Sequence, residues 1–293
     1  MWVALLGCDA GDEVVEPIVV ARAPCGFAEA PAGVIDVSER ADVFHTGVYA
    51  RVDAVLQEAP SPNFHEVATE AGACRHYHYA PASCDPICAD GEVCTAESTC
   101  AAFPGTVSGG TLSVEGLAVA VTIDAEDYSP GSYYGPGGLP SLLFEALDPI
   151  GARLAGGEVP ALTLGTEGVV AMDTALVDSG YTLTDGNDAT FTWTPGPDPE
   201  ACVAVVLNGF NVSHGAPLSD IVRCETTDTG SVDVPRAMVD AFPHGTTPEV
   251  TEGYDWPHAT LSRYTRARAD TEFGPIELLV RSTSYFLLEH PER

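Results

Sequence analysis

Hydrophobic residues alternate with small or polar ones along much of the chain, with the period of two that is typical of half-buried β-strands. In residues 117–123 every second residue is Leu, Val or Ile, and residues 203–207 repeat the pattern with Val and Leu. In residues 190–194 Phe and Trp alternate with threonines, and a Pro-Gly-Pro turn then ends the strand. Residues 260–268 and 276–288 flank a short polar turn, which predicts a closing β-hairpin.

The remaining elements are shorter. Extended runs at residues 43–56 and 74–79 predict strands, whereas residues 235–242 predict two helical turns that begin with proline, a residue tolerated at the first helical position. Turn residues separate the strands at intervals typical of sandwich folds. We therefore predict an all-β fold, an antiparallel β-sandwich of immunoglobulin-like architecture with a small disulfide-knotted insert.

Cysteine and charge distributions divide the chain into five parts. Residues 1–8 resemble a truncated signal with a lipobox, and residues 9–24 have the acidic composition of a tether. Residues 25–80 form an N-terminal β segment. Residues 81–104 form a cysteine-rich knot with too few apolar side chains for a core, and residues 105–293 form the sandwich domain.

The start of the chain, Leu5-Leu6-Gly7-Cys8, resembles a bacterial lipobox, in which a small residue precedes the lipidated cysteine. The segment departs from a usual export signal because it has no basic residue and a short apolar stretch. We infer a start codon assigned too far downstream, or a fragment. The alternative is that Cys8 is an ordinary thiol near a start methionine.

The number of cysteines supports the lipobox reading. There are nine cysteines, which is an odd number for an exported protein. Assigning Cys8 to the lipid leaves eight for four disulfides: Cys25, Cys74, Cys84, Cys88, Cys94, Cys100, Cys202 and Cys224. Each disulfide is expected to stabilise the fold by about 2–4 kcal/mol.

Four of these cysteines crowd into residues 84–100 at spacings of three, five and five residues. Zinc ribbons usually have two tight pairs far apart, so disulfides are favoured over a zinc site. The nearest plausible pairing in the knot is Cys84–Cys94 with Cys88–Cys100, although three connectivities remain open.

For the other four cysteines, a cross-strand bridge between Cys202 and Cys224 is expected. That leaves Cys25 with Cys74 by elimination.

Net charge excludes one class of function. The chain has 12 basic and 43 acidic residues, so its formal charge is 12 − 43 = −31, and every basic residue is arginine. A surface this negative repels phosphate backbones and anionic lipids, which excludes nucleic acid as a partner. No apolar run reaches the ~18 residues that a membrane-spanning helix needs.

Two Asp-Ser/Thr-Gly triplets are candidates for acid–base catalysis. Asp178-Ser179-Gly180 and Asp228-Thr229-Gly230 match the triplet of aspartic proteases, in which two aspartates share a proton. They lie only 50 residues apart, too close for two pepsin-like lobes, and such triplets are also common turns. An aspartic hydrolase using Asp178 and Asp228 is thus an alternative function.

A metal-dependent hydrolase is the other alternative. His76 and His78 are two apart on a predicted strand, so they face one side and could chelate a transition metal, with Glu70 to complete the site. The competing interpretation is an exposed edge strand with polar residues. We predict no cofactor.

Other motifs carry weaker signals. Residues 185–188 (Asp-Gly-Asn-Asp) offer oxygen ligands as calcium loops do, yet lack the full loop pattern and favour a turn. Residues 211–213 match the glycosylation triplet. Four arginines near the C-terminus suggest an anion or polysaccharide patch, or the neutralisation of an acidic sheet: Arg263, Arg266, Arg268 and Arg281. No esterase, phosphate-loop, dinucleotide or His-Glu-x-x-His motif occurs.

The segment 131–138 contains two adjacent tyrosines among glycines. Tyr133 and Tyr134 make it a candidate binding loop, because tyrosine supplies contact area at low entropic cost. The competing interpretation is a plain connection between two strands.

The order of motifs after the knot resembles a known group of proteins. It runs Gly109-Gly110-Thr111-Leu112-Ser113-Val114-Glu115-Gly116-Leu117, Gly156-Gly157-Glu158-Val159-Pro160-Ala161, Phe191-Thr192-Trp193-Thr194-Pro195-Gly196, Arg223-Cys224 and Val232-Asp233-Val234-Pro235. Over residues 80–245 the chain resembles the cysteine-containing secreted lipoproteins that myxobacterial-type genomes encode in many copies. The resemblance implies an envelope β-sandwich protein with no assigned reaction.

Together these features predict a lipoprotein held in the cell envelope, at the outer membrane or its periplasmic face, by a lipid on Cys8. We expect it to act as a binding or structural module with a protein or polysaccharide ligand.

Overall fold

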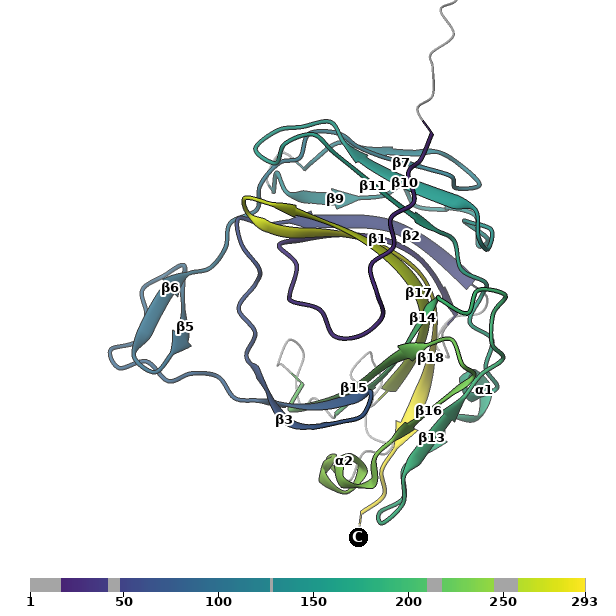
Figure 1. Cartoon of the computed structure of the whole chain (residues 1–293). Helices are drawn as coiled ribbons and strands as arrows, with labels where there is room; N and C mark the ends of the chain where they lie inside the picture. The colour runs from purple at the N-terminus through teal and green to yellow at the C-terminus, as the bar shows by residue number, and fades with distance from the viewer. Residues whose placement is uncertain (1–16, 42–47, 127–128, 210–217, 245–257, 293) are drawn as a thin grey trace, which may run out of the picture.

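A strongly curved ten-stranded sheet dominates the molecule (Figure 1). The computed structural model describes residues 17–41, 48–126, 129–209, 218–244 and 258–292. The spatial order of the strands is β3 (His65–Ala71), β4 (Cys74–Tyr79), β15 (Asp220–Thr227), β14 (Cys202–Asn208), β17 (His258–Thr271), β18 (Gly274–Glu289), β1 (Gly33–Ala41), β2 (Val48–Leu56) and β9 (Ser132–Tyr134), and β12 (Tyr181–Thr182) pairs with β18 beside this path.

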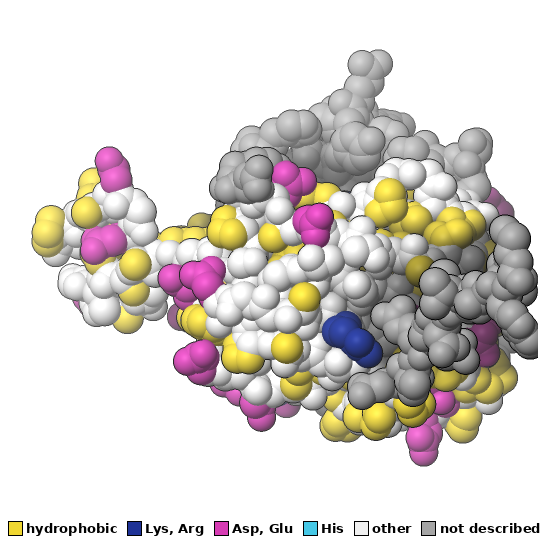
Figure 2. Space-filling model, turned by 90° about the horizontal axis from the view of Figure 1, so that it is seen from above, with side chains coloured by type: hydrophobic (Ala, Val, Ile, Leu, Met, Phe, Trp, Pro, Cys, Tyr) yellow, Lys and Arg dark blue, Asp and Glu magenta, His cyan; other side chains and the backbone are white. Residues whose placement is uncertain are grey.

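Smaller elements cover the convex face of this sheet (Figure 1). Over one half lies a four-stranded sheet in the order β11 (Leu162–Glu167), β10 (Pro149–Leu154), β7 (Leu112–Glu115) and β8 (Val121–Ile123). Over the other half lie β13 (Ala189–Thr192) and β16 (Ser231–Val234), with α1 (Leu176–Ser179) and α2 (Arg236–Ala241). The hairpin of β5 (Glu92–Ala96) and β6 (Thr99–Ala102) stands apart from the body (Figures 1 and 2).

The prediction of an all-β, mainly antiparallel sandwich is confirmed. Strands β17 and β18 are the predicted closing hairpin, and α2 begins after Pro235 as expected. Two pairings are parallel: β1 with β18, and β12 with β18. Two smaller sheets therefore cover the convex face of the large one (Figure 1).

The first hydrophobic core lies between β1, β2, β18 and the four-stranded sheet. Its fully buried side chains include Ile35, Val52, Leu112, Ile150 and Leu278. In β1, β2 and β7 these residues alternate with exposed or half-buried ones, because successive side chains point to opposite faces.

The second core lies between β14, β15, β17, β18 and the pair β13–β16 with α2. It includes Phe191, Leu207, Val222, Met238 and Phe286. Strands β17 and β18 contribute to both cores, so they tie the two halves of the molecule together.

A polar seam separates the two cores where the alternation of β17 and β18 places polar residues inward. We define it by Arg263, Thr265, Ser282 and Ser284, all of which are nearly inaccessible to solvent. The hydroxyl of Ser284 donates to the carbonyl of Met172 at 2.8 Å, and the backbone N–H of Met172 donates to Ser282 at 2.9 Å. The segment around Met172, which connects the two covering layers, is thereby bound to β18.

Two sequence expectations differ from the structure. The alternation at residues 117–123 contains a turn, so only Val121–Ile123 form a strand. Gly116 makes this turn with φ of +82°, and a Cβ there would lie 2.0 Å from the carbonyl oxygen of Pro149. In the strand predicted over residues 43–56, Val48–Leu56 form β2, and residues 42–47 lie outside the described residues. The sequence pattern did not predict strand β1, because its polar residues interrupt the alternation of hydrophobic positions.

The N-terminal segment is also more integrated than expected. Strands β1 to β4 of the predicted segment 25–80 belong to the same sheet as β14, β15, β17 and β18. Within the expected tether, residues 17–24 pack along the body: the N–H of Ala21 donates to Gly165 and that of Ala23 to Arg266. Residues 9–16 lie outside the described part. No helix within the described ranges is long and apolar enough to cross a membrane.

Candidate functional site

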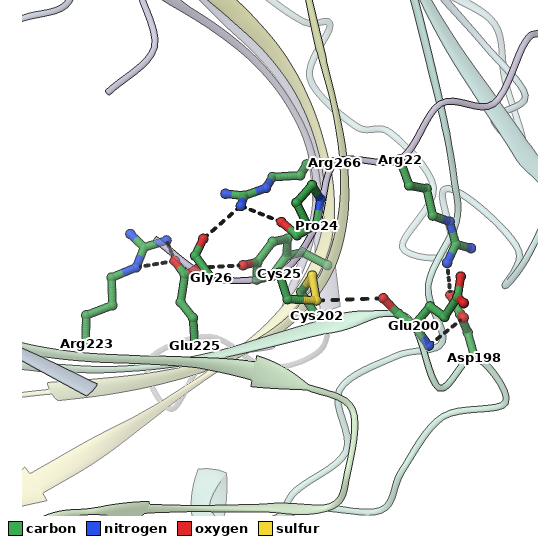
Figure 3. The surroundings of a disulfide bond; sticks show 11 residues. Arg22, Pro24, Cys25, Gly26, Asp198, Glu200, Cys202, Arg223, Glu225 and Arg266 are labelled. Carbon is green, nitrogen blue, oxygen red and sulfur yellow. Dashed lines mark hydrogen bonds and ion pairs between the residues drawn. A yellow bond between two sulfur atoms is a disulfide. The ribbon is translucent and has the colours of Figure 1, made fainter. Parts of the chain in front are cut away.

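A short N-terminal segment crosses the concave face of the ten-stranded sheet (Figures 1 and 3). We call residues 22–31 the strap. Cys25 of the strap is disulfide-bonded to Cys202 of β14, with 5.3 Å between the Cα atoms. Arg266 of β17 donates from Nη2 to the carbonyls of Pro24 at 2.6 Å and Gly26 at 2.8 Å (Figure 3). The strap is therefore fixed covalently and by charge-assisted hydrogen bonds.

Ion pairs and hydrogen bonds hold both ends of the strap as well. At one end, Arg22 forms ion pairs with Glu167 and, at 2.6 Å, with Asp198. At the other end, Arg268 donates from Nη1 to the carbonyl of Glu29 at 3.0 Å. The backbone of the strap is thus held at both ends by contacts within the protein.

A groove of about 430 Å³ lies between the strap and the sheet. Its lining mixes aromatic, apolar and charged side chains, among them Phe27, Tyr77, Ile221, Arg223, Glu225 and Glu277. A second hollow of about 660 Å³ lies where the β5–β6 hairpin joins the body, but its lining is mainly small residues and prolines. The groove beside the strap therefore offers the more selective set of contacts.

One network of hydrogen bonds forms the floor of the groove. Glu225 accepts from Arg223 Nε at 2.7 Å and from the Tyr264 hydroxyl at 3.0 Å. Burial, together with the Glu225 carboxylate, raises the pKa of Tyr264 well above its usual value. Tyr264 therefore remains a protonated donor that holds Glu225 in place.

The rings of Phe27 and Tyr77 form one wall, and a guanidinium group contacts one of them. The Arg75 guanidinium lies 4.1 Å above the centre of the Phe27 ring, and Phe27 meets Tyr77 edge to face at 6.5 Å. Arg75 Nε donates to Glu70 at 2.8 Å, and this hydrogen bond raises the pKa of Arg75. The wall presents π faces beside a charge that is already paired.

The four C-terminal arginines do not form a single cationic patch. Arg263 faces the opposite, convex side and is buried in the polar seam. On the concave face, Arg268 pairs with Glu277 at 3.0 Å, and Arg281 pairs with Asp36 through two bonds of 2.8 and 2.9 Å. Burial alone would lower the pKa of Arg281, but the Asp36 carboxylate raises it above its usual value. These pairs agree with the second interpretation of the sequence, in which the arginines neutralise an acidic sheet.

The expected tyrosine loop is a strand. Tyr133 and Tyr134 lie in β9, at the edge of the large sheet. Tyr133 is fully buried, accepts from the N–H of Gly109 and donates to the carbonyl of Gly110, both at 2.9 Å. Tyr133 is therefore a core residue and not a ligand contact. Tyr134 is 52% exposed and is accessible to a ligand.

The structure corrects two of the expected disulfides. Cys25 pairs with Cys202 and Cys74 with Cys224, in place of Cys202–Cys224 and Cys25–Cys74. Cys202 points to the concave side, where it packs with Tyr264, whereas Cys224 points into the second core on the other face of the sheet. Cys74 and Cys224 stand directly opposite on neighbouring strands β4 and β15.

The knot pairs as Cys84–Cys94 and Cys88–Cys100, which confirms the nearest-neighbour expectation. Because all four sulfurs are bonded, the zinc alternative at the knot is wrong. Every described residue of β5 and β6 is exposed or half-buried, so the cross-links hold the hairpin without a core.

His76 and His78 face the same side as predicted, but their partner is Asp220. The ring nitrogens lie 2.9 Å (His76) and 3.1 Å (His78) from the same carboxylate oxygen of Asp220. Glu70 points elsewhere and pairs with Arg75, so the proposed ligand set does not form. His76 and His78 therefore share one carboxylate, that of Asp220.

The two candidate catalytic aspartates are not a pair. Asp178 is exposed on α1, whereas the Asp228 side chain is fully buried in the polar seam. Asp228 accepts from Trp193 Nε1 at 2.5 Å, Gly196 N at 2.7 Å and Arg263 Nε at 2.8 Å. Its role is structural, and the aspartic hydrolase hypothesis is wrong because the carboxylates cannot share a proton.

The calcium-like loop is a turn whose carboxylates point in different directions. Asp188 accepts the N–H of Arg236 at the start of α2, whereas Asp185 faces His244 and His290. The sequence reading missed both histidines, since they lie far from residue 185 in the chain. Cys8 and the triplet 211–213 lie outside the described residues.

The fold and the groove define a disulfide-linked, two-layer β protein with a covalently strapped concave face. The chain matches no protein-family model and no curated protein.

Proposed function

We propose that the chain is an exported envelope lipoprotein of the secreted, cysteine-containing type, anchored through Cys8, that binds a ligand in the groove beside the strap. Four disulfides support an oxidising compartment, where such bonds persist. They use all eight later cysteines, so Cys8 is the one left for a lipid.

The groove carries the proposal, because it combines rings with charges that are already paired. Phe27 and Tyr77 offer apolar faces, while Arg223, Glu225 and Glu277 offer donors and acceptors in fixed positions. A neutral, hydroxyl-rich chain suits such a surface, since hydroxyls both donate and accept and need no net charge. The net charge of −31 disfavours polyanions. We therefore favour a neutral polysaccharide over a protein ligand.

Two tyrosines test the location of the site. Tyr77 lines the groove, whereas Tyr134 lies on the distant edge strand β9. The purified protein is titrated with neutral oligosaccharides by calorimetry. Tyr77→Ala should abolish the measurable heat of binding, and Tyr134→Ala should leave it unchanged. Loss of binding in Tyr134→Ala alone would move the site to β9, and no binding by the wild type would overturn the ligand class.

Anchoring is tested separately. Mass spectrometry of the native protein should find an acylated N-terminal Cys8 and the four disulfides described above. A free Cys8 thiol in the native protein would contradict the lipoprotein part of the proposal and leave the groove unaffected.

A further inference from the structure

Two histidines and one aspartate meet at the end of the second core. His290 follows β18, His244 follows α2, and Asp185 belongs to the turn after β12. The ends of α2 and β18 lie side by side (Figure 1). One nitrogen of each ring and one oxygen of the carboxylate all lie within 4.8 Å of one another.

Backbone carbonyls fix the tautomer of both rings. His290 Nδ1 lies 3.1 Å from the carbonyl oxygen of Phe242, and His244 Nδ1 lies 3.0 Å from that of Pro291. A carbonyl oxygen can only accept, so each Nδ1 carries the proton. In a neutral ring Nε2 then presents its lone pair. Histidines that bind metals are oriented by the same kind of bond to the other ring nitrogen.

Both lone pairs are directed at the Asp185 carboxylate. The Nε2 atoms of His290 and His244 lie 3.4 and 3.6 Å from Oδ1 of Asp185. His244 Nε2 is buried, and no described residue shares a hydrogen bond with it. Two imidazole nitrogens and one carboxylate oxygen thus converge, an arrangement that a bound cation stabilises.

The spacing fits a tetrahedral ion. Zinc lies about 2.0–2.2 Å from nitrogen and oxygen ligands, which places neighbouring ligand atoms about 3.3–3.5 Å apart. The two nitrogen–oxygen distances are 3.4 and 3.6 Å. The side chains of His290, His244 and Asp185 are 1%, 25% and 35% exposed, and the three atoms that face one another are buried.

We infer that Asp185, His244 and His290 form a binding site for a divalent transition metal of the zinc type. Two imidazoles and one carboxylate are a ligand set that zinc takes, with a fourth position for water. The ion would link the ends of α2 and β18 to the turn after β12, three segments distant in the sequence.

Zinc itself is the probe for the test. After dialysis against a chelator and removal of the chelator, the full chain is titrated with Zn²⁺ by calorimetry, and its thermal unfolding is followed with and without the ion. We expect one saturable equivalent of Zn²⁺ and a raised melting temperature. Replacing Zn²⁺ with Co²⁺ should give the visible absorption of a tetrahedral site.

Variants assign the binding to these residues. His244→Ala and Asp185→Asn should each weaken Zn²⁺ binding by more than about 100-fold, and both replace partly exposed residues, so the fold should persist. His78→Ala removes an exposed histidine from the separate group around Asp220 and should leave one equivalent bound. Absence of a saturable equivalent in the wild type, or its persistence in His244→Ala, would overturn the inference.

Discussion

At the scale of residues, the buried Arg263–Asp228 pair has a dense set of hydrogen bonds. Arg263 donates to Asp228 and to three backbone carbonyls, those of Val170, Ala171 and Thr194. A charge that is taken out of water needs this full set of partners, because its removal from solvent costs several kcal/mol. The seam therefore depends on both members of the pair.

Removing the acidic partner should be costly. Asp228→Ala leaves the Arg263 guanidinium buried without its counter-ion, so we expect the free energy of unfolding to fall by about 3–5 kcal/mol. Asp53→Ala is the control, since it removes an ion pair whose Arg51 side chain is 45% exposed and should cost less than about 1 kcal/mol. Urea denaturation measures both, and equal losses would contradict the argument.

A buried carboxyl predicts a pH effect. Glu39 accepts the N–H of Leu143 at 2.5 Å in the first core, and burial raises its pKa above the usual 4.5 in spite of the backbone hydrogen bonds. The folded protein thus holds this proton more tightly than the unfolded chain does. The stability that results is present below about pH 4.5 and lost as the pH rises through the folded-state pKa.

Glu39→Gln should remove this loss. The difference in unfolding free energy between variant and wild type should therefore grow in favour of the variant from about pH 4 to about pH 7. Denaturation curves across this range provide the measurement, and a difference that shrinks with pH would show that the sign is wrong.

At the scale of elements, strand alternation decides what each cysteine can reach. Strand β14 puts Val203, Val205 and Leu207 on the core face, so Cys202 must face the other way. Cys224 shares its face with buried Val222. The information that these two cysteines face opposite sides was present in the sequence. Which strand lies beside which was not, since Cys74 meets Cys224 across 150 residues.

The disulfides should contribute unequally. Cys25–Cys202 closes a span of 177 residues and fixes the strap, whereas Cys88–Cys100 closes 12 residues in a hairpin outside both cores. The double variant Cys25→Ser/Cys202→Ser should lose about 3–5 kcal/mol of unfolding free energy. The control, Cys88→Ser/Cys100→Ser, should leave the main transition within about 0.5 kcal/mol. Equal shifts in the denaturant midpoint of the two double variants would contradict this prediction. They would show that the β5–β6 hairpin unfolds cooperatively with the body of the protein.

At the scale of the whole molecule, net charge opposes compactness. A formal charge of −31 repels itself, although many arginines are paired with carboxylates. Figure 2 shows acidic side chains scattered over one face, with little basic surface among them. Screening should therefore favour the folded state more than it weakens the ion pairs.

Salt should stabilise the protein. Raising NaCl from about 0.01 M to about 0.5 M shortens the screening length several-fold, and we expect the melting temperature to rise by about 2–4 °C. The same series at a pH near the carboxyl pKa values should show a smaller rise, because fewer charges remain. A fall in melting temperature with salt at neutral pH would mean that the ion pairs dominate.

The sequence by itself determined the all-β class, the closing hairpin, the short helix and the presence of disulfides, because period-two alternation, proline positions and cysteine numbers are local properties. Tertiary structure alone decided how the four cysteines outside the knot pair, how the strap encloses a groove, and that Asp185 meets His244 and His290. Those contacts depend on the order of the strands in the sheet. For example, β1 pairs in parallel with β18, which places Gly33 beside Ile276. No local pattern encodes which strands become neighbours, because that choice is made by burying both cores at once.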